Sequence, residues 1–146
     1  MKQELIHQLN GYLANVGVSY VKLHNLHWNV VGGQFKAVHE YLETLYDGFA
    51  QTLDAVAELL KMNGAAPLAS MRDYLSAATI QELDSQERDV KTVLTVTLAD
   101  METLMAQAEA IRTAADEADD YAAANRMESD LEQYSKTVWF LHSMLK

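Results

Sequence analysis

Apolar residues recur at steps of three and four along four long stretches of the chain. This spacing constrains the fold more than any other feature, because it places apolar side chains along one face of an α-helix. The four stripes, named by their first and last apolar residues, are Leu5–Leu26, Phe35–Leu60, Val90–Ile111 and Tyr121–Leu145. The chain has one proline and no cysteine, so proline interrupts little and no disulfide or thiolate metal site is available. The sequence therefore predicts an all-α protein built from four amphipathic helices.

Glycines predict where the first two helices end. The pair Gly32-Gly33 follows the first apolar stripe, and Asn63-Gly64 follows the second, with Pro67 three residues further on. Glycine after the last apolar residue, with proline just beyond, is typical of a helix C-terminus. We therefore expect the first helix to end near residues 30–33 and the second near Asn63.

Residues 65–84 form a long connection between the second and third stripes, and MRDYLSAA within it predicts a short extra helix. We expect Asp84-Ser85-Gln86-Glu87 to cap the start of the third long helix, and the fourth to begin between Asp116 and Asp120. Four helices of about 30 residues with one long crossover form the ferritin-like variant of the four-helix bundle. The fold expected is thus a single ferritin-like domain over residues 1–146, with a short extra helix between its second and third long helices.

The charge balance argues against nucleic acid as a partner. The chain has 11 Lys and Arg against 21 Asp and Glu, a net charge of −10, and its first seven residues contain one lysine and one glutamate. Such a surface repels phosphates. We find no basic and apolar leader at the start and no run of about 18 apolar residues, so we expect no membrane segment and a cytoplasmic protein.

The residues suited to chemistry lie on the second predicted helix. At about 100° per residue, His39, Glu43, Asp54 and Glu58 fall within about 100° of one another on one helical face. Imidazole and carboxylate together suit iron, manganese or zinc. However, Glu43 and Asp54 lie about 16 Å apart along such a helix, so one chain cannot close these ligands around a metal pair.

The same residues are arranged symmetrically about position 48.5. Positions 39 and 58 sum to 97, and so do 43 and 54. If two copies of the helix cross antiparallel between Gly48 and Phe49, the first pair of one subunit meets the second pair of its partner. A two-fold dimer makes each such contact twice, which predicts two equivalent sites per interface. The bend after the first helix brings His27 to the rim of each site.

On spacing alone, interpretations without a metal site remain open. Acidic residues at helical spacing usually form a solvated face, a lone histidine is often structural, and the symmetry can arise by chance. Trp28, next to His27, has two interpretations: a buried aromatic anchor, or a side chain that packs beside the site and quenches stray oxidising equivalents.

Residues 23–60, LHNLHWNVVGGQFKAVHEYLETLYDGFAQTLDAVAELL, resemble the signature of the Dps family of mini-ferritins, and the TVWFLHSML tail agrees with it. The resemblance implies a ferroxidase with metal ligands His27 and His39 from one subunit and Asp54 and Glu58 from its partner. Glu43 stands where the family usually has aspartate, and its extra methylene alters the reach of this ligand. The implied protein is a hollow homododecamer that oxidises Fe(II), preferably with hydrogen peroxide, and stores ferric iron.

The resemblance also implies a role for the acidic segment 116–120, which lines a three-fold iron channel in similar proteins. Asp116, Asp119 and Asp120 are the pore candidates. Two alternative functions are a DNA-compacting nucleoid protein and a scaffold bundle whose metal site has decayed. Retention of the histidines, the aspartate and the glutamate of the site argues against the scaffold, and the acidic charge makes DNA binding the less favoured function.

Overall fold

The computed structural model describes residues 1–146 and contains five α-helices and two very short strands. The elements, in chain order, are α1 (Gln3–Asn29), β1 (Val30–Val31), α2 (Phe35–Met62), α3 (Met71–Ala77), β2 (Arg88–Asp89), α4 (Val90–Glu117) and α5 (Tyr121–Leu145). The four long helices and the short helix in the connection are those predicted from the sequence. None of these helices combines the length and the apolar character needed to cross a bilayer.

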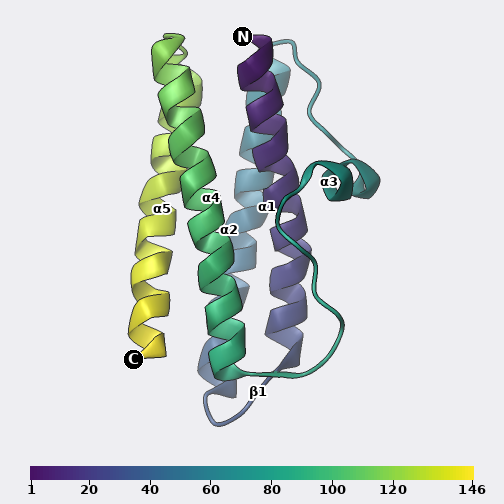
Figure 1. Ribbon diagram of the computed structural model, residues 1–146, viewed down its shortest axis with the longest axis vertical. Helices are drawn as coiled ribbons and strands as arrows, with labels where there is room; N and C mark the ends of the chain where they lie inside the picture. The colour runs from purple at the N-terminus through teal and green to yellow at the C-terminus, as the bar shows by residue number, and fades with distance from the viewer.

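The bundle consists of two helical hairpins, α1–α2 and α4–α5, packed side by side (Figure 1). The connection from α2 to α4 runs the whole length of the bundle, so that α2 and α4 point the same way (Figure 1). The short helix α3 lies outside the bundle against α1. Contacts are extensive within each hairpin, whereas α2 and α5 touch sparingly, which leaves a groove between them.

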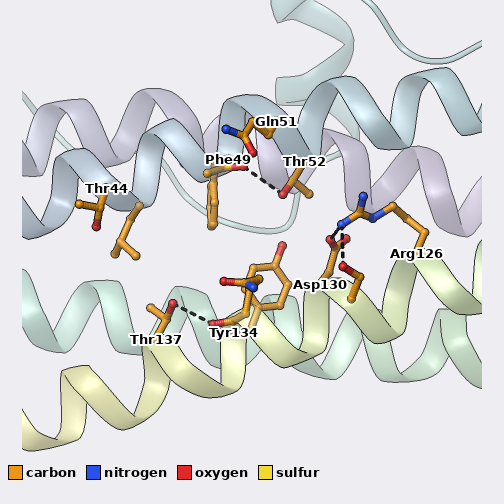
Figure 2. A pocket seen from close by; sticks show the side chains of 12 residues that line it. Thr44, Phe49, Gln51, Thr52, Arg126, Asp130, Tyr134 and Thr137 are labelled. Atoms are coloured by element: carbon orange, nitrogen blue, oxygen red, sulfur yellow. Dashed lines mark hydrogen bonds and ion pairs between the residues drawn. The ribbon is translucent and has the colours of Figure 1, made fainter.

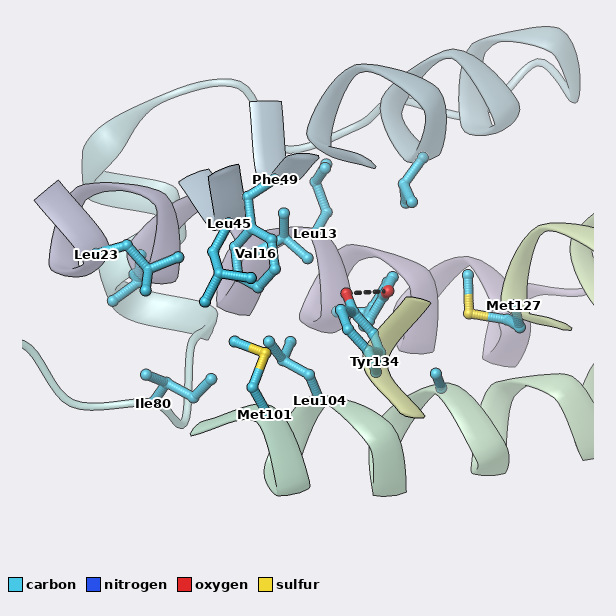
Figure 3. Packing of buried hydrophobic residues seen from close by; sticks show 14 of the residues in the cluster. Leu13, Val16, Leu23, Leu45, Phe49, Ile80, Met101, Leu104, Met127 and Tyr134 are labelled. Carbon is cyan, nitrogen blue, oxygen red and sulfur yellow. Dashed lines mark hydrogen bonds between the residues drawn. The ribbon is translucent and has the colours of Figure 1, made fainter. Parts of the chain in front are cut away.

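The apolar stripes meet in one core along the bundle axis (Figure 3). Complete burial of a large apolar side chain contributes roughly 1.5–3 kcal/mol, so the stripes supply most of the driving force for folding. Figure 3 labels members from every long helix and from the connection: Leu13, Val16, Leu23, Leu45, Phe49, Ile80, Met101, Leu104, Met127 and Tyr134.

Helices α1 and α2 both end close to the glycines that follow them, as predicted. The chain leaves α1 at Val30, and Gly32 then adopts a φ of +127°, which side chains other than glycine rarely tolerate. At the end of α2, Gly64 has a φ of +74°, and its N–H donates to the Lys61 carbonyl while that of Ala65 donates to Leu60. This pair of hydrogen bonds is a Schellman motif, which satisfies carbonyls in the last turn of the helix.

The predicted start of α4 was wrong. Asp84–Glu87 lies in the connection, and α4 begins only at Val90, where the Asp89 carboxylate accepts a 2.7 Å hydrogen bond from the Thr92 N–H. The reason is a non-local contact. Strands β1 and β2 pair in parallel, with Val30 opposite Arg88, and hold residues 88–89 extended beside the α1–α2 turn. The start of α5 was predicted correctly, since Asp120 caps it by accepting from the Ala123 N–H at 3.1 Å.

Candidate metal centre

His27 and His39 meet at the α1–α2 turn and fix each other's orientation. The Nδ1 atom of His27 lies 2.6 Å from the His39 carbonyl, and Nδ1 of His39 lies 2.7 Å from the His27 carbonyl. The two rings stack with centroids 3.6 Å apart and planes 12° from parallel. Since a carbonyl only accepts, each Nδ1 donates, and an uncharged ring with this arrangement carries its free lone pair on Nε2. This is the tautomer in which imidazole binds a metal.

Local structure explains this reciprocal pair. His27 occupies the last turn of α1 and His39 the second turn of α2, and the tight connection through Gly32 brings the two turns together. Phe35 stacks on the outer face of His39 with ring centroids 5.0 Å apart. His27 is only 5% exposed, whereas His39 is partly exposed. His39 is therefore the more accessible ring of the pair.

A second aromatic layer surrounds His27. The ring of Tyr46, on α2, meets His27 edge-on at 5.2 Å and stacks on His24 at 3.7 Å. Nδ1 of His24 in turn donates to the Tyr20 carbonyl at 2.7 Å. Burial raises the pKa of the Tyr46 phenol, and the Glu43 carboxylate raises it further, so the phenol stays protonated. Sequence reasoning did not identify Tyr46, although it lies seven residues after His39 on the same helical face.

The three predicted carboxylate ligands, Glu43, Asp54 and Glu58, lie on the exposed side of α2. Within this single chain no group of three or more His, Asp or Glu side chains could hold a metal ion. Of the five predicted ligands, the two histidines are in direct contact within the chain. Gly48 is exposed, and a Cβ atom placed on it would meet nothing within 4 Å. Its lack of a side chain is therefore not required by packing within the chain.

Trp28 and the acidic segment lie outside this pair. Trp28 is 67% exposed, so it is not an anchor of the bundle core, and its ring lies 5.4 Å from that of His24. Asp116 and Asp119 are exposed, and Asp120 caps α5. The α4–α5 turn, which carries this segment, lies at the opposite end of the bundle from the α1–α2 turn (Figure 1). Their role in a pore stays a prediction.

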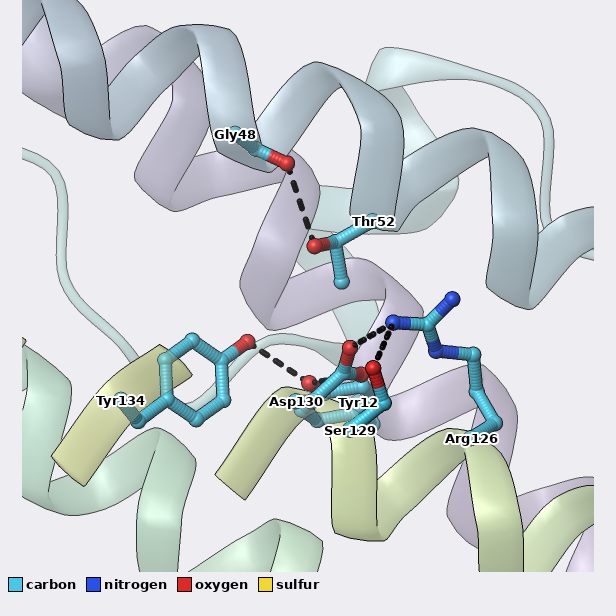
Figure 4. Close-up of polar contacts among 7 residues, drawn as sticks. All are labelled: Tyr12, Gly48, Thr52, Arg126, Ser129, Asp130 and Tyr134. Atoms are coloured by element: carbon cyan, nitrogen blue, oxygen red, sulfur yellow. Dashed lines mark hydrogen bonds and ion pairs between the residues drawn. The ribbon is translucent and has the colours of Figure 1, made fainter. Parts of the chain in front are cut away.

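Sequence reasoning missed a buried cluster in the middle of the bundle, which we call the polar core cluster: Tyr12, Arg126, Asp130 and Tyr134 (Figure 4). The Tyr12 hydroxyl lies 2.7 Å from the Asp130 carboxylate and 2.6 Å from the Tyr134 hydroxyl. Arg126 forms an ion pair with the other oxygen of Asp130. Burial raises the pKa of Asp130, against the lowering effect of the Tyr12 hydrogen bond and of Arg126. One signal was available, the spacing of four between Arg126 and Asp130.

Three members of this cluster, Arg126, Asp130 and Tyr134, line a cavity of about 390 Å³ in the groove between α2 and α5 (Figure 2). Most of the lining is polar, with Thr44, Gln51 and Thr52 from α2 facing Thr137 on α5. The histidine pair does not line it. The cavity and the candidate metal centre are therefore separate features of the molecule.

Comparison with known proteins identifies a family and close structural neighbours. A family model described as a ferritin-like domain matches residues 6–146. The chain is 37% identical over 138 residues to the DNA protection during starvation protein of Brevibacillus brevis, covering 94% of this chain and 92% of that protein. It is 34% identical over 139 residues to antigen TpF1 of Treponema pallidum, covering 95% of this chain and 78% of the antigen.

Solved structures agree with these relatives. The crystal structure of a Dps protein from Bacillus brevis superposes with a TM-score of 0.95 at 34% identity, covering all of both chains. The Dps protein from Vibrio cholerae O1 superposes with a TM-score of 0.94 at 30% identity, covering 99% of this chain and 90% of that one. That protein is described as a member of a broad superfamily of ferritin-like diiron-carboxylate proteins.

Proposed function

Because the chain belongs to the Dps family of ferritin-like proteins, we propose that it oxidises Fe(II) with hydrogen peroxide and stores the ferric product in a hollow dodecamer. Family membership confirms the ferritin-like architecture expected from the sequence and supports a general role in iron storage and protection.

The observation that carries the proposal is the reciprocal histidine pair. His27 and His39 each use Nδ1 on the other's main-chain carbonyl, so both Nε2 atoms are left as metal ligands in a fixed orientation. A pair with a structural role alone has no need of two ring nitrogens that lack a partner within the chain. Imidazole nitrogens with carboxylate oxygens form a ligand set suited to Fe(II).

In the proposed dimer the carboxylates come from both subunits. Glu43 would join the histidines of its own chain, and Asp54 and Glu58 would come from the partner's α2, crossing near Gly48. Two Fe(II) ions would then each give one electron to a peroxide molecule. The O–O bond breaks, two protons are taken up, and two water molecules and two Fe(III) ions result. The side chains hold the iron with open positions for the oxidant.

An anaerobic Fe(II) titration, followed by stoichiometric peroxide and ultraviolet absorbance, tests the site. We expect the double variant His27→Ala/His39→Ala to assemble but to oxidise Fe(II) about 100-fold more slowly, since both nitrogen ligands are lost. His142→Ala, which removes an exposed histidine of α5, is the matched control and should keep the wild-type rate. An intact double variant with the wild-type rate would remove the proposed site.

A bulky residue at position 48 tests the proposed crossing. A Cβ atom there meets nothing within 4 Å and Gly48 is exposed, so Gly48→Leu should fold normally while it blocks the close approach of a partner helix. We expect smaller assemblies in size-exclusion chromatography and weaker iron binding, with Gly48→Ala affected less. Full assembly of Gly48→Leu with normal iron binding would contradict the proposed crossing.

The names of several relatives support a second candidate, a protein that binds DNA. The net charge of −10 per chain disfavours it, because a cage of twelve copies would multiply the repulsion of phosphates. We therefore expect metal-free protein to leave DNA mobility unchanged in a gel-shift titration at physiological salt. Retardation that weakens steeply with added salt would favour the DNA-binding candidate instead.

A further inference from the structure

Two hydrogen bonds from one side chain tie the end of α1 to the connection between α2 and α4. Asn25 donates through Nδ2 to the Leu83 carbonyl at 3.1 Å and to the Asp84 carbonyl at 3.2 Å. Its Oδ1 accepts a 2.8 Å hydrogen bond from Nδ2 of Asn29. At about 100° per residue, Asn25 and His27 fall on opposite faces of α1. An effect of Asn25 on the histidine pair therefore passes through the main chain of the helix.

The connection then pairs with the residues that follow α1. It reaches the α1–α2 turn at the end of the bundle (Figure 1), where β2 runs parallel to β1 with Val30 opposite Arg88. Val30 is buried, and its ψ of 136° takes the chain out of the helix. A Cβ atom placed on Gly32 would lie 3.7 Å from Cγ2 of Val90, so the start of α4 packs on the same turn. The connection thus fixes the chain where α1 ends.

The position of this helix end decides which donor the His27 carbonyl receives. Val30 donates its N–H to the Leu26 carbonyl, so His27 is the first residue whose carbonyl lacks a donor within the helix. That carbonyl accepts instead from Nδ1 of His39 at 2.7 Å. In a helix continued through Val31, the Val31 N–H would compete with His39 for it. The orientation and tautomer of His39 therefore depend on where α1 ends.

Local signals alone do not end α1 before Val31. The residues that stop a helix by themselves are Gly32-Gly33, so the sequence predicts an end near residues 30–33. We propose that Asn25 is a positioning residue for the metal centre. By anchoring the connection it holds β2 against β1, ends the helix before Val31 and leaves the carbonyl of His27 to His39. This inference rests on the proposed binding of Fe(II) by the pair.

Solid-state NMR of the assembled, metal-free protein with ¹⁵N-labelled histidine tests the inference before iron is added. In the wild type we expect His27 and His39 to carry their protons on Nδ1. In Asn25→Ala, which removes both bonds to the connection, we expect the Nδ1–H form of His39 to fall and the Nε2–H form to appear. Anaerobic Fe(II) binding should weaken about tenfold, as for loss of a partner behind a metal ligand. Asn29→Ala should have a smaller effect, since it removes only the bond to Asn25.

Asn10→Ala is the matched control. Asn10 also holds the connection by two hydrogen bonds, but from the first half of α1: it donates to the Ala66 carbonyl at 3.2 Å and accepts from the Leu68 N–H at 2.9 Å. Alanine favours the helix at either position, so both variants should assemble. Their losses in denaturant unfolding should be similar, whereas Asn10→Ala should keep the wild-type tautomers and Fe(II) affinity.

Two results would overturn the positioning role of Asn25. One is an assembled Asn25→Ala variant with wild-type histidine tautomers and Fe(II) affinity. The other is an Asn10→Ala variant that shifts the tautomers equally, since the effect would then come from the connection as a whole. A wild type that holds both Nδ1–H tautomers but binds no Fe(II) would instead overturn the proposed function.

Discussion

The histidine pair and the polar core cluster are both built from polar side chains of α1 and a second helix. They differ in which of their hydrogen-bonding atoms have partners within the chain. In the core cluster, one carboxylate oxygen of Asp130 accepts from Tyr12 and the other from Arg126, and both phenols have partners. In the histidine pair, only Nδ1 of each ring has a partner within the chain. The first arrangement pairs every buried polar atom except the Nε of Arg126, and the second retains two unused imidazole nitrogens.

This difference separates structural polar groups from functional ones. A buried polar group stabilises a fold only when its hydrogen bonds are made, and removing one member leaves the others unpaired. A ring nitrogen that keeps a free lone pair adds no hydrogen bond to the fold and is available to a ligand. We therefore expect mutations in the core cluster to lower stability, and mutations in the histidine pair to lower iron oxidation.

The largest effect on stability is expected for Asp130→Ala. The substitution removes the acceptor of Tyr12 and the counter-charge of Arg126 from a site that is 2% exposed, which should cost about 3–5 kcal/mol. Denaturant unfolding at matched protein concentration measures the loss. Asp130→Asn keeps one acceptor oxygen and should lose less. An unchanged unfolding midpoint in the alanine variant would show that the cluster is not a stabilising unit.

A smaller effect is expected for Tyr134→Phe. This change removes the 2.6 Å contact between the Tyr134 and Tyr12 hydroxyls but leaves the bond from Tyr12 to Asp130. We expect a loss of about 0.5–1.5 kcal/mol in the free energy of unfolding. The control is Tyr121→Phe, which alters a phenol that is 76% exposed and should change nothing measurable. A loss as large as that of Asp130→Ala would contradict this division of roles.

For His39→Ala we expect a small loss of stability and a large loss of Fe(II) oxidation. The ring is partly exposed, and water can replace its hydrogen bond to the His27 carbonyl, so the stability loss should stay below about 1 kcal/mol. Fe(II) oxidation should nevertheless fall at least tenfold, because a nitrogen ligand is gone. Parallel unfolding and oxidation measurements on one preparation decide the matter. A variant that loses stability but not oxidation would place His39 with the structural polar groups.

The smallest effect on stability is expected for Asp89→Asn, at a residue outside both the histidine pair and the polar core cluster. The hydrogen bond from the Thr92 N–H lowers the pKa of this exposed carboxyl, so its ionised form is favoured in the folded state. Its stabilising contribution is thus present above the unfolded pKa, about 3.9, and is lost as pH falls through the lower folded value. Asp89→Asn should remove this part of the acid dependence. Identical acid unfolding profiles for variant and wild type would contradict it.

The helices could be predicted because their signals are local. Apolar spacing, the glycines after α1 and α2, and the capping Asp120 act over a few residues. The start of α4 could not be predicted in this way, because the pairing of β1 with β2 depends on residues 58 positions apart in the chain.

The site was predictable in part for the same reason. His27 and His39 flank one short turn, so their meeting follows from the hairpin. Tyr46 and the core cluster were missed, because tyrosines at helical spacing are indistinguishable from apolar core residues until their hydroxyl partners are known. Tyr12 and Tyr134 lie 122 positions apart, and only the assembly of all four long helices into one bundle brings their hydroxyls together.

The sequence by itself determined four amphipathic helices, a hairpin that joins two histidines, and an acidic face on α2. These follow from side-chain periodicity and from the φ angles that glycine alone adopts easily. Only the tertiary structure decided which nitrogen of each imidazole is free and which phenol touches the pair. It also decided which polar groups complete one another inside the bundle. The physical reason is that hydrogen-bond partners and ring contacts are set by distances between helices, which spacing along the chain does not encode.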